Sequence, residues 1–263
     1  MKLGFIGAGN MAGAIIKGFI NKNCVNSSDI YFIRQNKEKQ AQQAKELGIN
    51  GCDDYDSLIE NSDILFLGVK PVVFPTLLPQ IAKSVKKKNP LVVSMAAGLT
   101  TDSIREMLGY DAKIIRIMPN VNAAIAMSTT AVCKNEFASD EDLATIKNLF
   151  STIGLTTEVP ENQFAIFTAI AGCSPAYVYL ARGAQKMGMN KQKALEIAAS
   201  AVIGSASMYA QSNEHPQELV DKVCSPGGTT IEGVTTLEEY KFTAGVVKAV
   251  ENSILKDREL SKK

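Results

Sequence analysis

The sequence opens on Lys2-Leu3-Gly4-Phe5-Ile6-Gly7-Ala8-Gly9-Asn10-Met11-Ala12-Gly13-Ala14. Its apolar start predicts a buried β-strand, and apolar residues then recur at helical spacing as far as Ile20. Between them stands Gly7-x-Gly9-x-x-Ala12. In dinucleotide-binding units the first glycine permits the tight turn, the second lets backbone approach a diphosphate, and the third small residue lets the helix pack on the strand. The stretch predicts a dinucleotide site with its phosphates at the helix N-terminus, an ordinary tight turn being the alternative.

The first 160 residues alternate between apolar runs and helical segments. The strands that we predict after the first cover residues 30–33, 63–69, 91–94, 113–117, 129–133 and 155–159. Strands that alternate with helices over short connections are typical of a doubly wound α/β sheet. We therefore expect a Rossmann-like dinucleotide-binding domain over residues 1–160, in which the last two strands extend the sheet.

The residues after the second predicted strand indicate which dinucleotide is preferred. Sites for NAD usually place an acidic residue here to bind the ribose 2′-hydroxyl, whereas NADP sites replace it. This chain has Arg34-Gln35-Asn36-Lys37, with no acid before Glu38. Cationic donors bind a phosphate through charge-assisted hydrogen bonds. The pattern predicts NADPH as the cofactor, with NADH possible, and its alternative is a solvated helix start.

Ligands of such sheets lie beyond the carboxyl ends of the strands, so the small or polar residues there are further candidates for cofactor contact. The alternative for each of them is that a small or polar residue simply suits a short loop and has no contact with a ligand. The candidates are Ala8, Asn10 and Met11 in the first turn, Val69, Lys70 and Pro71 after the strand 63–69, Ala96, Ala97 and Gly98 after the strand 91–94, and Asn120 after the strand 113–117.

Residues 161–263 contain no convincing strand pattern and are expected to be all-helical. The predicted helices cover residues 162–171, 175–187, 191–211, 216–224 and 237–256. Several are apolar around most of their circumference, and a lone layer of such helices needs to be covered. We therefore expect residues 161–263 to form a dimerisation domain.

A glycine-rich turn interrupts these helices at Cys224-Ser225-Pro226-Gly227-Gly228-Thr229-Thr230. Consecutive glycines followed by hydroxyl residues offer free backbone N–H groups and two side-chain donors. Such a turn can bind a carboxylate or a phosphate. A plain interhelix turn is the alternative.

The bulk composition excludes several other classes of function. Lys and Arg number 28 and Asp and Glu 27, so the net charge of +1 gives no reason to expect nucleic acid or an anionic membrane as a partner. Five scattered cysteines and one histidine predict neither a metal site nor a disulfide framework. Dispersed thiols in a chain that starts directly on a strand suggest the cytoplasm. The uncharged residues 162–181 are interrupted by polar side chains, which favours a buried helix over a membrane span.

Together these motifs resemble the pyrroline-5-carboxylate reductase family over nearly the whole chain. Ser225-Pro226-Gly227-Gly228-Thr229-Thr230 is the most specific of them. The others are Gly7 to Ala12, Val69-Lys70-Pro71, Ala96-Ala97-Gly98, Arg116-Ile117-Met118-Pro119-Asn120 and Ser174-Pro175-Ala176-Tyr177. The family commonly has glycine where this chain has Ser174.

The resemblance implies hydride transfer from NAD(P)H to the C=N carbon of 1-pyrroline-5-carboxylate, which gives proline. It implies that backbone N–H groups of Gly227 to Thr230, together with Ser225, bind the substrate carboxylate. The Thr230 hydroxyl would bind the ring nitrogen, and Asn120 and the 96–98 loop would lie near the nicotinamide. It also implies a dimer, or a larger ring built from dimers.

Two other functions remain open from the sequence. A β-hydroxyacid dehydrogenase shares the two-domain plan, but the Gly-x-x-x-Lys pattern of its catalytic lysine does not stand out where the helices begin here. A nucleotide-sensing protein without catalysis would keep Gly7 to Ala12 but would have no use for the turn at 225–230. The single histidine, His215, precedes Pro216, and this position favours a helix-entry contact over a catalytic acid.

Overall fold

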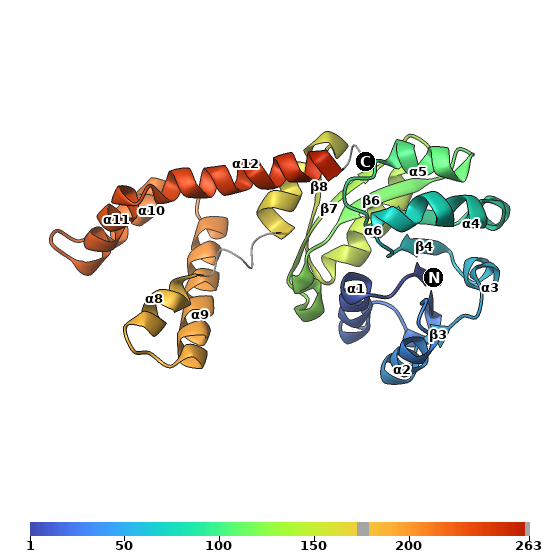
Figure 1. Cartoon of the computed structure of the whole chain (residues 1–263), viewed down its shortest axis with the longest axis horizontal. Helices are drawn as coiled ribbons and strands as arrows, with labels where there is room; N and C mark the ends of the chain where they lie inside the picture. Colours follow the sequence, from blue (N-terminus) through green and yellow to red (C-terminus); the bar gives the residue numbers. More distant parts are fainter. Residues whose placement is uncertain (173–178, 261–263) are drawn as a thin grey trace. The chain divides into compact units, whose positions relative to one another are not determined.

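The computed structural model describes residues 1–172 and 179–260. They fall into two compact units, one formed by residues 1–172 with the chain end from Ile254, the other by the residues between. The first unit is built on an eight-stranded sheet with the order β3-β2-β1-β4-β5-β6-β7-β8 (Figure 1). The strands are β1 (Leu3–Ile6), β2 (Ile30–Ile33), β3 (Asn50–Gly51), β4 (Ile64–Leu67), β5 (Leu91–Ser94), β6 (Ile114–Met118), β7 (Ser128–Lys134) and β8 (Gly154–Glu158).

The predicted extension of the sheet by the last two strands is confirmed, but β7 runs antiparallel to β6 whereas the other pairs are parallel. Only the short 3-10 turn Val121–Ile125 lies between β6 and β7. A parallel neighbour needs a crossover of a dozen or more residues, which this connection does not supply. The two-residue strand β3 is too short to leave an apolar pattern, and the sequence did not predict it.

Helices cover both faces of the sheet, because successive side chains of its buried strands point to opposite sides. Phe5 and Phe66 contribute to one apolar core and Ile6 and Leu65 to the other. The first core packs against α1 (Asn10–Asn21), α2 (Lys37–Leu47) and α6 (Asp140–Ser151). The second packs against α3 (Tyr55–Glu60), α4 (Phe74–Lys88) and α5 (Thr101–Leu108). The predicted doubly wound, Rossmann-like architecture is therefore confirmed.

The ends of β1 and β4 approach each other too closely for side chains. Gly7 has φ +87°, and a Cβ there would lie 2.8 Å from Val69 Cγ1. A Cβ on Gly68 would lie 2.4 Å from the Gly7 carbonyl oxygen. The strand ends are joined here, since Gly68 N donates to Ile6 O over 2.8 Å. Glycine is thus required on both sides of the contact.

The second unit contains α8 (Leu180–Lys186), α9 (Lys191–Gln211), α10 (Pro216–Val223), α11 (Thr229–Glu239) and most of α12 (Phe242–Leu260). The predicted helix 191–211 is confirmed at both ends. The predicted helix 237–256 is wrong at its start: α11 runs to Glu239, and Lys241 adopts a left-handed φ of +53° that ends one helix before the next begins.

The helical segment that follows β8 is less regular than predicted. Residues 162–171 were expected to be one helix, but they divide into a 3-10 turn (Glu161–Gln163), α7 (Phe164–Phe167) and a π-helical turn (Thr168–Gly172). The Ser174 to Tyr177 motif lies outside the described residues. Among the helices that the structure does describe, none has the length and apolar character needed to cross a lipid bilayer.

Candidate functional site

The turn between β1 and α1 leaves the N-terminus of α1 free to bind an anion. Gly9 is the N-cap residue, no side chain caps the helix, and its first turn contains no acidic residue. The first N–H groups of a helix have no partner inside the helix, and the helix dipole favours negative charge there. Space around Gly9 is open, since a Cβ built on it would meet nothing within 4 Å. The local geometry fits a diphosphate.

A groove of about 430 Å³ runs over this turn. The β1–α1 side contributes Ala8, Gly9, Asn10, Gly13 and Lys17, and the β2–α2 side contributes Arg34, Lys39 and Gln43. Three of these side chains are cationic, and a 490 Å³ hollow beside the groove is lined by Arg34, Gln35, Asn36 and Lys39. The residues present therefore suit a ligand with several phosphates.

Arg34 is held at two points by α2. Its backbone N–H donates to Gln40 Oε1 over 2.7 Å, and its guanidinium Nη1 donates to Gln43 Oε1 over 2.7 Å. Helix α2 begins at Lys37, because Asn36 caps it by accepting from Lys39 N. The cap uses the side-chain oxygen of Asn36, which can still donate through its amide nitrogen.

Lys37 does not line this groove, because its side chain is engaged by Asp53 instead. Its ammonium lies 3.1 Å from the carbonyl oxygen of Asp53 and 3.9 Å from the Asp53 carboxylate. Lys39 lines the hollow beside Arg34 instead. Of the two lysines, Lys39 is thus the one whose side chain lines the same hollow as the Arg34 side chain.

A third hollow of about 520 Å³ opens on the other side of β2. It is lined by Gly7, Ile33, Asp54, Tyr55 and Val69, among others. Asp54 caps α3, and the hydrogen bond from Ser57 N holds the pKa of its carboxyl below the usual value. Val69 is the one member of the predicted 69–71 set that lines this hollow.

The other predicted strand-end residues lie at the carboxyl ends of β4 and β5. Lys70 and Pro71 are exposed at the start of a short 3-10 turn. Ala96 is buried and its N–H reaches Ser94 Oγ, Ala97 is exposed, and Gly98 adopts φ +78°. These residues form the rim of the sheet at the edge where the glycine turn also lies.

Asn120 holds chain segments together. Its side chain, 5% exposed, accepts from Thr129 N over 3.1 Å and donates to Ala171 O over 3.2 Å. It thereby joins the end of β6 to β7 and to the π-helical turn. Both polar atoms of its amide are engaged within the first unit.

A partly buried ion pair joins β6 to residue 161. Arg116 Nη1 lies 3.2 Å from Glu161 Oε1, and the guanidinium stacks over Phe164. Glu161 also accepts from the backbone and the hydroxyl of Thr101. The pKa of the neighbouring Cys133 thiol is raised to about 12, mainly by burial. This cluster ties residue 161 to β6 and α5.

The glycine-rich turn of the second unit ends directly in a helix. Gly227 adopts φ +67° and Gly228 N donates to Ser225 O over 3.0 Å. Helix α11 starts at Thr229, directly after Gly228, which takes an extended N-cap conformation. No side chain caps α11, so Thr229 and Thr230 lie in a first turn whose N–H groups can bind an anion.

His215 has the structural role that its position favours. It is the N-cap of α10, its Nδ1 accepts from Gln217 N over 3.2 Å, and Glu218 completes the capping box. The predicted helix-entry contact is confirmed.

Sequence reasoning missed Lys17, Lys39, Gln40, Gln43 and Gly68 at this edge of the sheet. Lys39 had a usable signal, since it stands three residues after the Asn36 cap, on the first turn of α2. The two glutamines had none, because their contacts depend on how α2 packs beside β2.

The chain resembles known proteins over its full length. A family model described as "Pyrroline-5-carboxylate reductase dimerisation" matches residues 161–260, and one described as "NADP oxidoreductase coenzyme F420-dependent" matches residues 2–98. The pyrroline-5-carboxylate reductase of Escherichia coli (strain K12) is 40% identical over 99% of this chain and 98% of its own length.

Solved structures agree with these matches. The 1-pyrroline-5-carboxylate reductase of Streptococcus pyogenes is 37% identical, with a TM-score of 0.88 over 98% of both chains. The pyrroline carboxylate reductase of Plasmodium falciparum, solved with NADP bound, is 28% identical, with a TM-score of 0.89 over 99% of this chain and 98% of its own. These likenesses over the full length of the chain lead to one conclusion: the chain belongs to the pyrroline-5-carboxylate reductase family.

Proposed function

We propose that this protein reduces 1-pyrroline-5-carboxylate to L-proline with NADPH, the last step of proline biosynthesis. The observation that carries the proposal is the groove over an uncapped helix N-terminus, lined by three cations, in a chain of this family. NADPH supplies a hydride to the imine carbon. The imine nitrogen is protonated readily near neutral pH, so the chain's main task is to hold the two reactants in register.

The glycine turn and the β2–α2 connection are the proposed cofactor site. Backbone N–H groups of residues 7–12 would bind the diphosphate, and Arg34, Gln35 and Asn36 the 2′-phosphate. Lys39 joins them because it lines the same hollow. Residues 69–71 and 96–98 would lie nearer the nicotinamide, with Asn120 acting as a support because its amide is already engaged.

The turn before α11 is the proposed substrate site. Ser225 and the N–H groups of Gly227 to Thr230 would bind the substrate carboxylate, and the Thr230 hydroxyl would bind the ring nitrogen. This proposal is supported by the uncapped start of α11 and by the left-handed Gly227. A carboxylate at such a helix end gains from both the free donors and the helix dipole.

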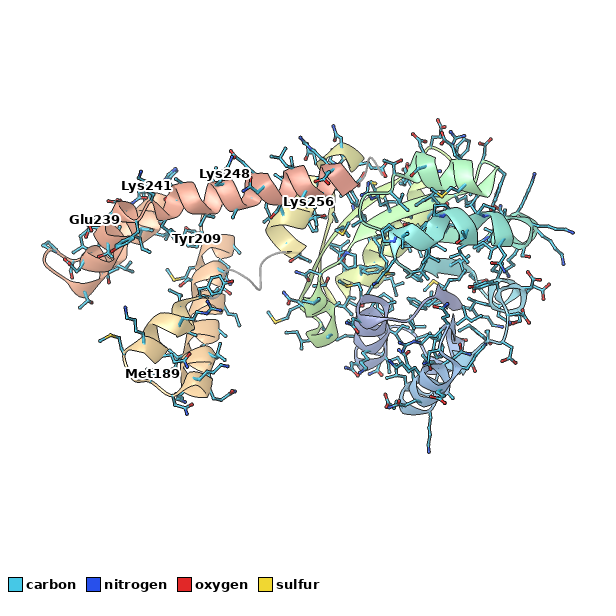
Figure 2. All side chains as sticks on the ribbon, viewed as in Figure 1. Met189, Tyr209, Glu239, Lys241, Lys248 and Lys256 are labelled. Atoms are coloured by element: carbon cyan, nitrogen blue, oxygen red, sulfur yellow. The ribbon has the colours of Figure 1, made fainter. Side chains whose placement is uncertain are left out.

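The helical region is proposed to start at residue 161, where the dimerisation match begins, and to form a dimer. Large apolar side chains of the second unit are exposed, among them Ile197, Ile203 and Val247, each between 47% and 53%. Met189 and Tyr209, labelled in Figure 2, are also more than 40% exposed. So much exposed apolar surface is typical of an interface. A ring of dimers is the larger assembly that we propose.

We also propose that the protein acts in the cytoplasm. The cysteines that the structure describes, Cys24, Cys52, Cys133 and Cys224, are free thiols. Free thiols persist in a reducing compartment.

The substrate is tested by following NADPH oxidation at 340 nm. We expect turnover with 1-pyrroline-5-carboxylate, and none above background without substrate or with the semialdehyde that a β-hydroxyacid dehydrogenase would reduce to its hydroxyacid. Turnover only with the semialdehyde, or binding of NADPH with no turnover at all, would contradict the proposal.

The cofactor site is tested by Arg34→Ala. Loss of charge-assisted hydrogen bonds should raise the KM for NADPH about 10- to 100-fold and leave the KM for NADH within about twofold. Lys37→Ala is the matched control and should leave both KM values within about twofold, because the Lys37 ammonium contacts Asp53 and does not line the groove. Equal effects of Arg34→Ala on both cofactors would remove Arg34 from 2′-phosphate binding.

The substrate site is tested by Thr230→Ala. If the hydroxyl bond strengthens in the transition state, kcat/KM for the imine should fall about 10- to 100-fold. Thr230→Ser keeps the hydroxyl and should restore most of the activity. Wild-type kinetics in the alanine variant would exclude the hydroxyl from the mechanism.

The assembly is tested by small-angle scattering and light scattering at micromolar concentration. We expect a mass of at least twice 28.3 kDa. A lysine in place of Ile203 should shift the population toward monomer, since it puts a charge on the exposed apolar surface of α9. A wild-type monomer would refute the dimer.

A further inference from the structure

We propose that Gln43 is a positioning residue that sets the preference for NADPH over NADH, by holding the Arg34 guanidinium in place for the 2′-phosphate. The inference rests on the proposed role of Arg34. Gln43 lies nine residues further along the chain, on α2, and nothing in the residue pattern at the end of β2 points to it.

Two glutamines of α2 hold Arg34, one at its backbone N–H and the other at its guanidinium. Gln40 Oε1 accepts from the Arg34 backbone N–H, and Gln40 Nε2 donates to Cys52 O over 2.8 Å. Gln40 is 6% exposed, so it locks the end of β2 to the end of β3 from a buried position. Gln43, three residues on and on the same face of the helix, accepts from Arg34 Nη1 over 2.7 Å. Backbone and guanidinium are therefore anchored separately.

Gln43 is itself held against α1. A Cβ built on the buried Gly13 would lie 3.4 Å from Gln43 Nε2, an ordinary van der Waals distance, so the Gln43 amide lies next to α1 at Gly13. Gln43, Gly13 and Arg34 all line the groove over the phosphate-binding turn. The guanidinium is thus aligned with the same groove that receives the diphosphate.

A neutral acceptor is the right chemistry for this task. Gln43 occupies one of the five N–H donors of the guanidinium and leaves its charge uncompensated, so the remaining donors can bind a phosphate. Fixing a long side chain before the ligand arrives removes an ordering cost from binding. Only a ligand with a 2′-phosphate gains from this, which makes the effect specific to NADPH.

The test is Gln43→Met, which keeps the length and removes the acceptor. Isothermal titration of the full-length protein with NADP⁺, NAD⁺ and adenosine 2′,5′-bisphosphate measures binding without turnover. We expect binding of NADP⁺ and of the bisphosphate to weaken about three- to tenfold, the range for loss of one hydrogen bond, with NAD⁺ binding within about twofold. The kcat at saturating NADPH should stay at the wild-type value.

A double-mutant cycle with Arg34→Ala shows whether Gln43 acts through Arg34. In the Arg34→Ala background, Gln43→Met should change NADP⁺ binding by less than about twofold. The control is Gln163→Met, the same substitution at an exposed position of the first unit that does not line the groove. It should leave the binding of NADP⁺ and NAD⁺ unchanged.

Two outcomes would overturn the inference. One is an equal loss of NADP⁺ and NAD⁺ binding in Gln43→Met, as expected if the residue only packs α2 against α1. The other is an effect that persists undiminished without Arg34. If Arg34→Ala alone leaves the ratio of NADP⁺ to NAD⁺ affinity unchanged, the proposed role of Arg34 is wrong. That result distinguishes a failure of the proposed cofactor site from a failure of the inference about Gln43.

Discussion

The edge of the sheet at which we propose that the nucleotide binds depends on a backbone contact between two glycines. Gly7 ends β1 and Gly68 follows β4, and a Cβ on either would collide with the backbone of the other strand end. Because both positions lack side chains, the two neighbouring parallel strands stay paired to their last residues. The chain can then turn sharply into α1 and present the first N–H groups of that helix.

The start of α1 and the side chains around it make this edge of the sheet electropositive. The start of α1 has neither a side-chain cap nor an acidic residue, while the caps of its neighbours are filled: Asn36 caps α2 and Asp54 caps α3. Uncapped N–H groups are costly unless a ligand or water binds them. The open terminus thus coincides with the groove that carries Lys17, Arg34 and Lys39. The start of α11 in the second unit also has no side-chain cap, but its first turn contains the acidic residue Glu232.

Several polar side chains that could have been read as ligands instead hold the framework. Asn120 ties β6 to β7 and to Ala171, and Glu161 joins Arg116 to Thr101. A buried amide is stable only when its hydrogen bonds are satisfied, and both polar atoms of the Asn120 side chain have partners. The partly exposed Glu161 carboxylate accepts from Thr101 and Arg116, although the buried Arg116 Nε has no partner among the described residues. Their partners come from distant parts of the sequence, so they fix the rim of the sheet rather than protrude from it.

The sequence by itself determined whatever depends on local backbone chemistry or on the period of apolar residues. This covers the glycine turn at residues 7–12, the bounds of β2 and α9, the helix-entry contact of His215 and the cation at position 34. Only the tertiary structure decided that β7 is antiparallel, that Lys37 binds Asp53 while Lys39 joins Arg34, and that Gln40 and Gln43 anchor that arginine. Each of these depends on contacts between segments far apart in the chain, and a periodic pattern says which face of an element is buried but not which neighbour it meets.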